Sequence, residues 1–371
     1  MKKVLYGTTA IIAAASFGAS AQAAEPIKLG VGGSMQQWFG YNAQEADGTA
    51  DWNKFGINSD SIIEFSGETT LDNGWVVSAQ LARDYVNNVR GGAAGGQPTI
   101  GGTNSIDSES AKVATPFGTV VAGWAAVYND GVHTSAPEVG ISYGDIRSWL
   151  SQPTAGWNSG AGWRSTSLDS LLGTGAEVTY ATPSFGGFSI GGTYQPRPTS
   201  AGVVNENTSG ATNDGYEVTA AFAGDLGAAS VKADIGTGYD GGTARGSNVG
   251  LSVGFGPVTL GGSYMDINDH TANRTSGAAS SQDGNAYDIG AQFDAAGWNF
   301  SLGYYREEQA GAVADTDAEV LDVAMLSARY TLGPGVQWRT SIFQGTRHGE
   351  ETADNNSTDA FGVVTGLNLS F

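Results

Sequence analysis

The final nine residues of the chain, 363–371, constrain its fold more than any other segment. Side chains there alternate in character from one position to the next. One set is Val363, Thr365, Leu367, Leu369 and Phe371, and the other is Val364, Gly366, Asn368 and Ser370. This period of two is typical of a β-strand with one apolar face. A closed barrel in a bilayer can end on such a strand, because the last strand pairs with the first and the terminal aromatic lies at the membrane interface.

The first 23 residues predict a cleaved signal peptide. Lys2 and Lys3 form a charged start, residues 4–17 are an Ala-rich apolar run, and residues 21–23 form a small-x-small cleavage site. We therefore expect residues 24–371 to form the mature barrel domain. A single membrane helix is the alternative, but its apolar core would be too short. No later apolar run approaches the ~18 residues that a membrane helix needs.

Charge and composition exclude several classes of protein. The formal net charge is −20, and it becomes −22 without Lys2 and Lys3. This acidic balance excludes nucleic-acid binding, which needs a basic surface. The 14 Tyr, 14 Phe and 9 Trp residues are too many for a disordered chain, although 57 Gly are also present. No cysteine occurs, so cysteine-ligated metals and thiol redox chemistry are excluded.

Alternation recurs along the mature chain, and no helical period of comparable length interrupts it. Seven short connections rich in Gly and Pro alternate with eight longer polar stretches. The short ones are 71–74, 115–118, 182–187, 225–227, 256–257, 294–297 and 332–335, and the long ones are about 43–60, 86–107, 129–173, 196–214, 240–247, 267–285, 308–319 and 345–359. Fifteen connections join sixteen strands. The sequence therefore predicts an all-β, up-and-down antiparallel transmembrane barrel with one short-turn end.

Aromatic residues gather at the short-turn end of the predicted strands. Trp75 and Trp298 directly follow short turns, and Tyr180, Phe185, Phe188, Phe255, Phe293, Tyr330 and Phe371 lie at or next to the same end. This pattern is typical of the interfacial girdle of a membrane barrel. The alternative, an aromatic core in a soluble β-sandwich, gives no reason for aromatic residues to collect at one end of nearly every strand.

Charged residues occupy the parity opposite to the apolar one. They include Lys28, Glu64, Glu68, Lys112, Glu177, Glu217, Lys232, Asp288, Arg329 and Arg339. A closed core cannot hold so many charges, because buried ionised groups without partners are unstable. A sixteen-stranded barrel, in contrast, is wide enough for a water-filled lumen. The sequence therefore predicts a channel lined by these side chains.

Three glycines, Gly33, Gly192 and Gly262, stand on the outward parity. They add no apolar side chain to the lipid face. Two interpretations remain open, namely close packing between subunits and bending of the sheet.

The third long stretch, 129–173, differs from the other long connections. It carries Trp149, Trp157 and Trp163 together with several Ile, Leu and Tyr residues. A solvated loop does not need such apolar content, so we expect this segment to fold into the lumen and pack on the barrel wall. Its charged residues are Asp130, Glu138, Asp145, Arg147, Arg164 and Asp169.

Four features resemble the Gram-negative general porins, in particular the alphaproteobacterial type. They are the predicted signal peptide, Pro116–Trp124, which leads into the third long stretch, Tyr180–Ser189, and the terminal Phe371. The resemblance covers the mature chain, and it implies a trimeric, sixteen-stranded barrel whose third loop narrows the pore. It also marks Phe371 as a terminal assembly signal.

In that family, acidic residues of the third loop face a basic cluster on the wall. The resemblance implies Asp130, Glu138, Asp145 and Asp169 for the acidic side of the constriction, and Lys28, Lys112, Lys232, Arg329 and Arg339 for its basic side. The sequence departs from the family in two places. Trp124 stands where many relatives have Arg, and Pro137-Glu138-Val139-Gly140 replaces the usual Pro-Glu-Phe-Gly-Gly run.

The function expected from these features is passive diffusion of small hydrophilic solutes and ions through the outer membrane, with a weak preference for cations. A substrate-specific porin with a ligand track is the first alternative, for which Trp149, Trp157 and Trp163 are candidates. An exported soluble β-protein that binds a glycan or a protein partner is the second. Expected partners are outer-membrane lipid, lipopolysaccharide and further copies of the chain in a homotrimer.

No enzyme activity, cofactor or metal site is predicted. His133, His270 and His348 all lie in long polar stretches, whereas a hydrolase would need a paired Ser and His on adjacent strands. The acidic runs at 266–269 and 307–308 match no ordered calcium-loop spacing. A weaker hypothesis is that divalent cations bridge these runs to lipopolysaccharide phosphates.

Overall fold

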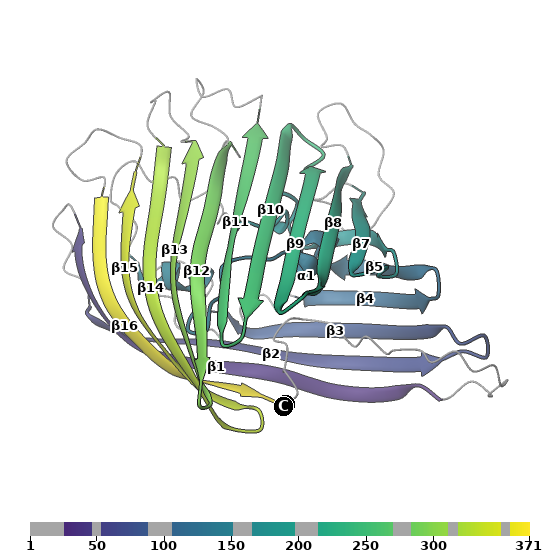
Figure 1. The fold of residues 1–371 in the computed structure, drawn as a ribbon, viewed down its shortest axis with the longest axis horizontal. Helices are drawn as coiled ribbons and strands as arrows, with labels where there is room; N and C mark the ends of the chain where they lie inside the picture. Colours follow the sequence, from purple (N-terminus) through teal and green to yellow (C-terminus); the bar gives the residue numbers. More distant parts are fainter. Residues whose placement is uncertain are drawn as a thin grey trace.

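The computed structural model describes residues 26–46, 53–87, 106–150, 165–196, 214–269, 283–310, 318–349 and 357–371. Within these ranges, sixteen antiparallel strands close into one barrel, in which sequence neighbours pair and β1 pairs with β16 (Figure 1). The predicted fold class is thereby confirmed. The predicted signal peptide, 1–23, lies outside the described residues. No helix in the described part of the chain is long and apolar enough to cross a membrane.

The strands follow one another in sequence around the barrel. They are β1 (Lys28–Ala46), β2 (Phe55–Thr70), β3 (Val76–Asn87), β4 (Ile106–Thr115), β5 (Gly118–Ala125), β6 (Gly175–Ala181), β7 (Phe188–Gln195), β8 (Gly215–Leu226), β9 (Ala229–Tyr239), β10 (Ala244–Phe255), β11 (Val258–Asp269), β12 (Gly284–Ala295), β13 (Trp298–Ala310), β14 (Ala318–Gly333), β15 (Val336–His348) and β16 (Ser357–Ser370). Short helices occur only between β5 and β6 among the described residues: α1 (Tyr128–Val132), α2 (Tyr143–Ile146), the 3-10 turn η1 (Arg147–Trp149) and α3 (Asp169–Leu172).

Alternation divides the side chains between the two faces of the wall. On β8, Tyr216 and Val218 are exposed, whereas Glu217 and Thr219 are buried on the inner face. Exposed apolar side chains recur around the barrel: Leu29, Phe65, Val178, Ile190, Ile235, Leu251, Leu260, Ile289, Leu302, Leu326, Ile342 and Val363. An apolar outer band with a polar interior is the arrangement that lipid on one side and water on the other stabilise.

Short and long connections alternate as predicted, but several of the long ones are shorter than expected. β1 continues to Ala46 and β2 begins at Phe55, within the stretch 43–60 that its polar content predicts as loop. On the outer face of β13, Arg306 Nη1 lies 3.1 Å from Asp322 Oδ2 on β14, and the ion pair is partly exposed. Charged groups on the outer face are stable in water rather than in lipid, so these two strands extend beyond the lipid at the long-loop end.

The barrel closes through β1 and β16. Their register pairs Met35 with Leu369 and continues past the end of β16, where Gly33 and Phe371 exchange backbone hydrogen bonds of 3.0 and 3.1 Å. A Cβ on Gly33 would lie 2.5 Å from the Ile62 carbonyl oxygen and 3.0 Å from the Phe371 ring. The missing side chain at Gly33 therefore lets the terminal aromatic lie against the seam.

The other two outward glycines are in the same situation. A Cβ on Gly192 would lie 2.7 Å from the Glu217 carbonyl oxygen, and a Cβ on Gly262 would lie 2.7 Å from the Asp288 carbonyl oxygen. Close approach of the neighbouring strand in a curved wall explains these residues, which supports the interpretation that they permit sheet bending.

Two aromatic girdles encircle the outer surface. The aromatic side chains expected at the short-turn end are on the outward face there, and Phe188, Phe255 and Phe371 are among the most exposed. A second row, which the sequence analysis missed, consists of tyrosines at the long-loop end: Tyr41, Tyr194, Tyr216, Tyr239, Tyr264, Tyr287 and Tyr304. The rows mark the two interfaces of a bilayer.

The apolar core lies inside the barrel, between the wall and the connection from β5 to β6. This connection, residues 126–174, is called the inner loop below; 126–150 and 165–174 are described. Its side chains pack on inward-facing residues of the wall in two clusters. The first comprises Trp38, Ile141, Tyr143, Ile146, Trp149, Leu150, Ala286, Tyr305, Leu321, Val323, Met325, Phe343, Ala360 and Val364, and the second comprises Val127, Leu168, Leu171, Leu172, Ala244, Met265 and Ile267. The prediction that this loop folds into the lumen is confirmed.

Candidate functional site

Polar side chains from five strands between β7 and β15 hold the inner loop against one side of the wall. Each accepts a hydrogen bond from a backbone N–H of the loop. Thr193 of β7 binds Tyr128 at 2.8 Å, Asp234 of β9 binds Thr134 at 2.7 Å, Asp288 of β12 binds Ala136 at 2.7 Å, Ser301 of β13 binds Val139 at 3.2 Å and Ser341 of β15 binds Ile141 at 3.1 Å. Buried N–H groups need such partners, so the wall specifies the path of the loop.

Glycines in the wall make room for this path. A Cβ on Gly261 of β11 would lie 2.9 Å from the Ser135 carbonyl oxygen, and a Cβ on Gly250 of β10 would overlap the Thr134 carbonyl oxygen. Gly303 of β13 likewise lies under the Tyr143 ring, which stacks on Tyr305 with ring centroids 5.6 Å apart. Part of the high glycine content therefore serves close approach between loop and wall.

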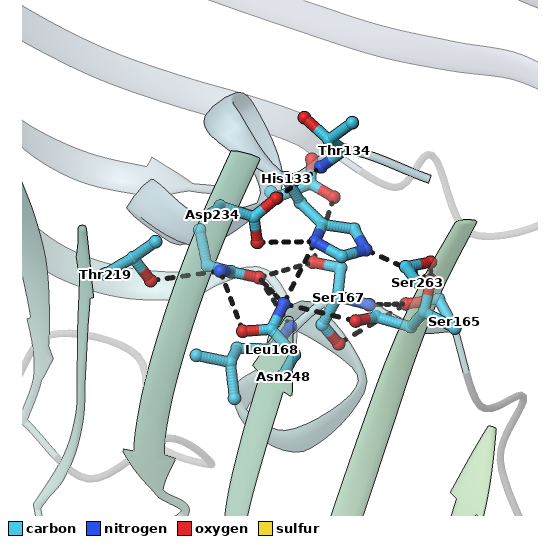
Figure 2. A network of polar contacts seen from close by, with 12 residues as sticks. His133, Thr134, Ser165, Ser167, Leu168, Thr219, Asp234, Asn248 and Ser263 are labelled. Carbon is cyan, nitrogen blue, oxygen red and sulfur yellow. Dashed lines mark hydrogen bonds and ion pairs between the residues drawn. The ribbon is translucent and has the colours of Figure 1, made fainter. Parts of the chain in front are cut away.

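A network of polar contacts anchors both ends of the inner loop (Figure 2). His133 Nδ1 lies 2.9 Å from Asp234 Oδ2 and 3.0 Å from Asn248 Nδ2. On the other side of the ring, His133 Nε2 lies 3.1 Å from Thr166 Oγ1. Thr166 belongs to the second leg of the loop, and Ser263 of β11 donates to it at 2.7 Å. The contacts tie two distant segments of the loop to β9, β10 and β11.

The opposite side of the lumen stays open. A cavity of about 950 Å³ lies between the inner loop and β1 to β6. The wall contributes Gln36, Asp60, Ser78, Gln80, Ser108, Ser110, Lys112, Thr119, Val121, Ala125, Thr179 and Ala181, and the loop contributes Tyr128, Asp130, Gly131, Ser142, Gly144, Asp145, Arg147, Ser165, Asp169 and Ser170 among others. The open space beside the described part of the loop therefore lies along β1 to β6.

Three of the four predicted acidic residues line this cavity, namely Asp130, Asp145 and Asp169. Glu138 does not, because its side chain turns back and accepts the Tyr143 N–H at 2.9 Å. Burial raises the pKa of Glu138 well above its usual range, which disfavours its charged form. The structure therefore separates Glu138 from the other three.

Only Lys112 among the predicted basic residues lines the cavity. The others are on the inward parity but are not among the lining residues. Lys28 is in register with Glu68, Lys232 lies two positions from the buried Asp234 on the side of the turn, and Arg329 and Arg339 are directly opposite each other on β14 and β15. The loop itself supplies a cation, Arg147, whose Nε lies 3.9 Å from Glu307 Oε1.

The remaining predicted lumen residues share the inward parity but differ in surroundings. Glu177, Glu217 and Asp288 are buried at 4%, 1% and 7% exposure, so they do not line the open cavity. Glu217, for example, accepts from the Thr193 and Thr219 hydroxyls at 2.9 Å. Glu64 and Glu68 lie on the inner face of β2, in register with Gly32 and Lys28.

Several lining residues were missed by sequence reasoning. Asp60 falls in a stretch expected to be loop, although its place in β2 puts it on the inner face. The hydroxyl and amide side chains of β3 and β4 give no sequence signal beyond their alternation. Trp124, which stands in place of a family Arg, is exposed on the outward face of β5 and takes no part in the cavity.

The aromatic candidates for a ligand track are not in the cavity lining. Trp149 is 7% exposed and packs over Gly56 of β2, where a Cβ would lie 3.0 Å from its ring. Trp157 and Trp163 lie outside the described residues. No group of three or more His, Asp or Glu side chains that could hold a metal ion occurs in the described ranges.

Comparisons with known proteins agree with this architecture. A family profile described as Gram-negative porin matches residues 7–347. No curated protein sequence matches. Among solved structures, the anion-selective porin from Comamonas acidovorans has a TM-score of 0.58 at 16% identity, covering 93% of this chain and 100% of that one. The trimer form of OmpT from Vibrio cholerae has 0.60 at 11% identity, covering 94% and 100%.

A third similar structure is the outer membrane channel DcaP of Acinetobacter baumannii, with a TM-score of 0.60 at 13% identity, covering 96% of this chain and 100% of that one. At such low identity these structures support the fold alone. The family profile, in contrast, matches most of the chain and agrees with the closed barrel and its internal loop. The chain belongs to the Gram-negative porin family, whose members are channels rather than enzymes, and it is a multi-pass β-barrel channel of the outer membrane.

Proposed function

We propose that this channel passes small hydrophilic solutes and ions by passive diffusion, with a weak preference for cations. The charge of the cavity lining supports the preference. Four carboxylates, those of Asp60, Asp130, Asp145 and Asp169, line it in the described residues against two cations, Lys112 and Arg147. Charges that line a narrow low-dielectric path raise the local concentration of ions of opposite sign.

The wall opposite the acidic loop supports passive diffusion of polar solutes. Its side chains are mainly uncharged: Gln36, Ser78, Gln80, Ser108, Ser110, Thr119 and Thr179. Hydroxyl and amide groups both donate and accept hydrogen bonds, so they replace part of a solute's hydration without demanding one chemical class. No catalytic step is needed for this function.

Reversal potentials in planar bilayers test the proposal. Purified protein in a KCl gradient is expected to give a permeability ratio of K⁺ to Cl⁻ above one, together with a conductance that does not saturate with any one sugar or amino acid. Clear anion selectivity would contradict the ion preference. Saturation by one solute class would favour the substrate-specific alternative instead.

The same proposal includes the channel's partners. We infer a homotrimer, because the OmpT structure from Vibrio cholerae is described as a trimer form. Chemical cross-linking in native membranes should give a trimer and no larger species. The exposed apolar band between the two aromatic girdles supports contact with outer-membrane lipid and lipopolysaccharide.

Removal of residues 1–23 also belongs to this proposal. Mass spectrometry of the mature protein should find Ala24 at its N-terminus.

A further inference from the structure

The side chain of Asn129 is fully buried and joins four parts of the molecule. Its amide nitrogen donates to Thr219 Oγ1 on β8 at 3.0 Å and to Asn248 Oδ1 on β10 at 3.2 Å. Its amide oxygen accepts from the Leu168 N–H at 2.8 Å, from Asn248 Nδ2 at 2.9 Å and from the Ser167 hydroxyl at 3.2 Å. An asparagine amide has two N–H donors and two acceptor lone pairs, so these contacts saturate it. Figure 2 labels its partners Thr219, Leu168 and Asn248.

These contacts connect the two legs of the inner loop. Asn129 belongs to the first leg and Leu168 to the second, 39 positions further along the chain. The next residue of each leg is an acid that lines the cavity, Asp130 after Asn129 and Asp169 after Leu168. The Ser167 hydroxyl accepts from the Asp169 N–H at 3.1 Å and lies 3.5 Å from Asp130 Oδ1. The two acids are therefore fixed relative to each other by residues that lie behind them.

We propose that Asn129 is a positioning residue for ion selectivity, which holds Asp130 and Asp169 together so that both act on the same passing cation. Two carboxylates repel each other, and only a rigid support keeps them close. The attractions of the two carboxylates for a cation add together when both lie within a few ångströms of it. Their sum becomes smaller when one leg of the loop moves away. Neither Asn129 nor its partner Asn248 lines the cavity itself.

This inference rests on the proposed cation preference, and its test separates the two. Asn129→Leu keeps the number and branching of the side-chain heavy atoms and removes every hydrogen bond of the amide. The measurements are the K⁺/Cl⁻ permeability ratio and the single-channel conductance of the full chain in planar bilayers. We expect the ratio to fall about twofold toward one, because the local field of the paired acids is weakened. Single-channel conductance should change much less.

Ser301→Ala is the matched control. It also removes a buried anchor of the inner loop, the bond to the Val139 N–H at 3.2 Å, but no neighbour of Val139 in sequence lines the cavity. A purely structural role for Asn129 predicts that both variants lower thermal stability and leave the permeability ratio equally unchanged. A positioning role predicts a changed ratio in Asn129→Leu alone.

A double-mutant cycle completes the test. Asp130→Asn combined with Asp169→Asn should abolish most of the cation preference, and adding Asn129→Leu should then change nothing further. If the two neutralising substitutions leave the ratio unchanged, the proposed function fails. If they lower it but Asn129→Leu does not, only the positioning role is overturned.

Thr219→Val covers the case in which Asn129→Leu fails to fold, as judged by circular dichroism. It removes the bond that Thr219 Oγ1 accepts from Asn129 Nδ2 at 3.0 Å, together with the one that it donates to Glu217 Oε2 at 2.9 Å, and keeps the shape of the side chain. We expect the permeability ratio to shift in the same direction by a smaller factor. A ratio identical to that of the unchanged protein, with folding intact, would overturn the proposal.

Discussion

At the scale of the residue, position in the inner loop decides what a charge can do. Asp130 and Glu138 are both acidic residues of the same segment, yet Asp130 is exposed in the cavity and Glu138 bends back onto the loop. Burial raises the pKa of Glu138 and so disfavours its charged form, which weakens its field on a passing ion. The difference follows from the path of the loop, because the Tyr143 N–H donates to the side chain of Glu138 at 2.9 Å.

Neutralising these two residues should therefore give unequal results. Asp130→Asn is expected to lower the K⁺/Cl⁻ permeability ratio by up to about twofold, because it removes a charge from the lining. Glu138→Gln should leave the ratio unchanged within error, since the residue is off the pathway. Reversal potentials in a KCl gradient measure both. Equal effects of the two substitutions would contradict this geometry.

Neutralising two cationic side chains of the wall should also change the permeability ratio to different extents. Lys112 lines the cavity, whereas Arg329 is not among the lining residues and donates to Asn299 Oδ1 at 3.1 Å. Lys112→Gln is expected to raise the cation preference, since it removes a repulsive charge from the constriction. Arg329→Gln should raise it by a clearly smaller factor. A larger effect of Arg329→Gln, measured in the same bilayer experiment, would contradict the assignment of the selective region to the cavity lining.

At the scale of the element, the inner loop packs closely on the strands because the wall offers glycines as well as polar side chains. Gly250→Ala should disturb this packing, because the new Cβ would overlap the Thr134 carbonyl oxygen and reach the carboxylate of Asp234. Overpacking of this kind costs about 1–3 kcal/mol. Urea unfolding of lipid-reconstituted protein should detect the loss.

Gly333→Ala is the control for that prediction. Gly333 lies near the turn between β14 and β15, where an added Cβ would meet nothing within 4 Å, so the methyl group fits freely. Its unfolding midpoint should stay close to that of the unchanged protein. Identical midpoints for Gly250→Ala and Gly333→Ala would mean that the loop adapts to the extra methyl group at no cost.

The strands were predictable from the sequence, and the details of the constriction were only partly so. A period of two specifies which face a residue such as Glu177 or Asp288 is on, and turn residues specify how many strands there are. Neither specifies how far along the barrel axis a residue lies. Lys112 and Arg329 share the inward parity, yet only Lys112 lines the cavity beside the inner loop, which depends on the register of every strand between them.

Contacts between distant segments were beyond the reach of the sequence. Asn129 and Leu168 have no local feature that marks them as partners, since their bond depends on how the wall bends the whole inner loop. The tyrosine girdle was missed for a different reason. Its members lie on different strands, and the row exists only once the strands are in register.

At the scale of the whole molecule, the acidic excess is spread over two regions with different consequences. The chain carries a net charge of −20, but the described lining of the cavity holds only four carboxylates and two cations. Charges on the outer rim, such as Asp322 and Glu308 beside Arg306, reach the permeating ion only through water. Net charge alone therefore does not determine selectivity, whereas the few charges at the constriction act at short range.

Salt concentration separates the two contributions. The Debye length falls from about 10 Å at 0.1 M to about 3 Å at 1 M, so distant charges are screened at high salt while lining charges still act. We expect the cation preference to decrease between these concentrations, measured at a constant activity ratio, but to remain above one. The cation preference that remains at high salt should vanish when Asp130→Asn and Asp169→Asn are combined. A preference that disappears at high salt in the unchanged protein would assign selectivity to the rim, because only charges close to the ion escape screening.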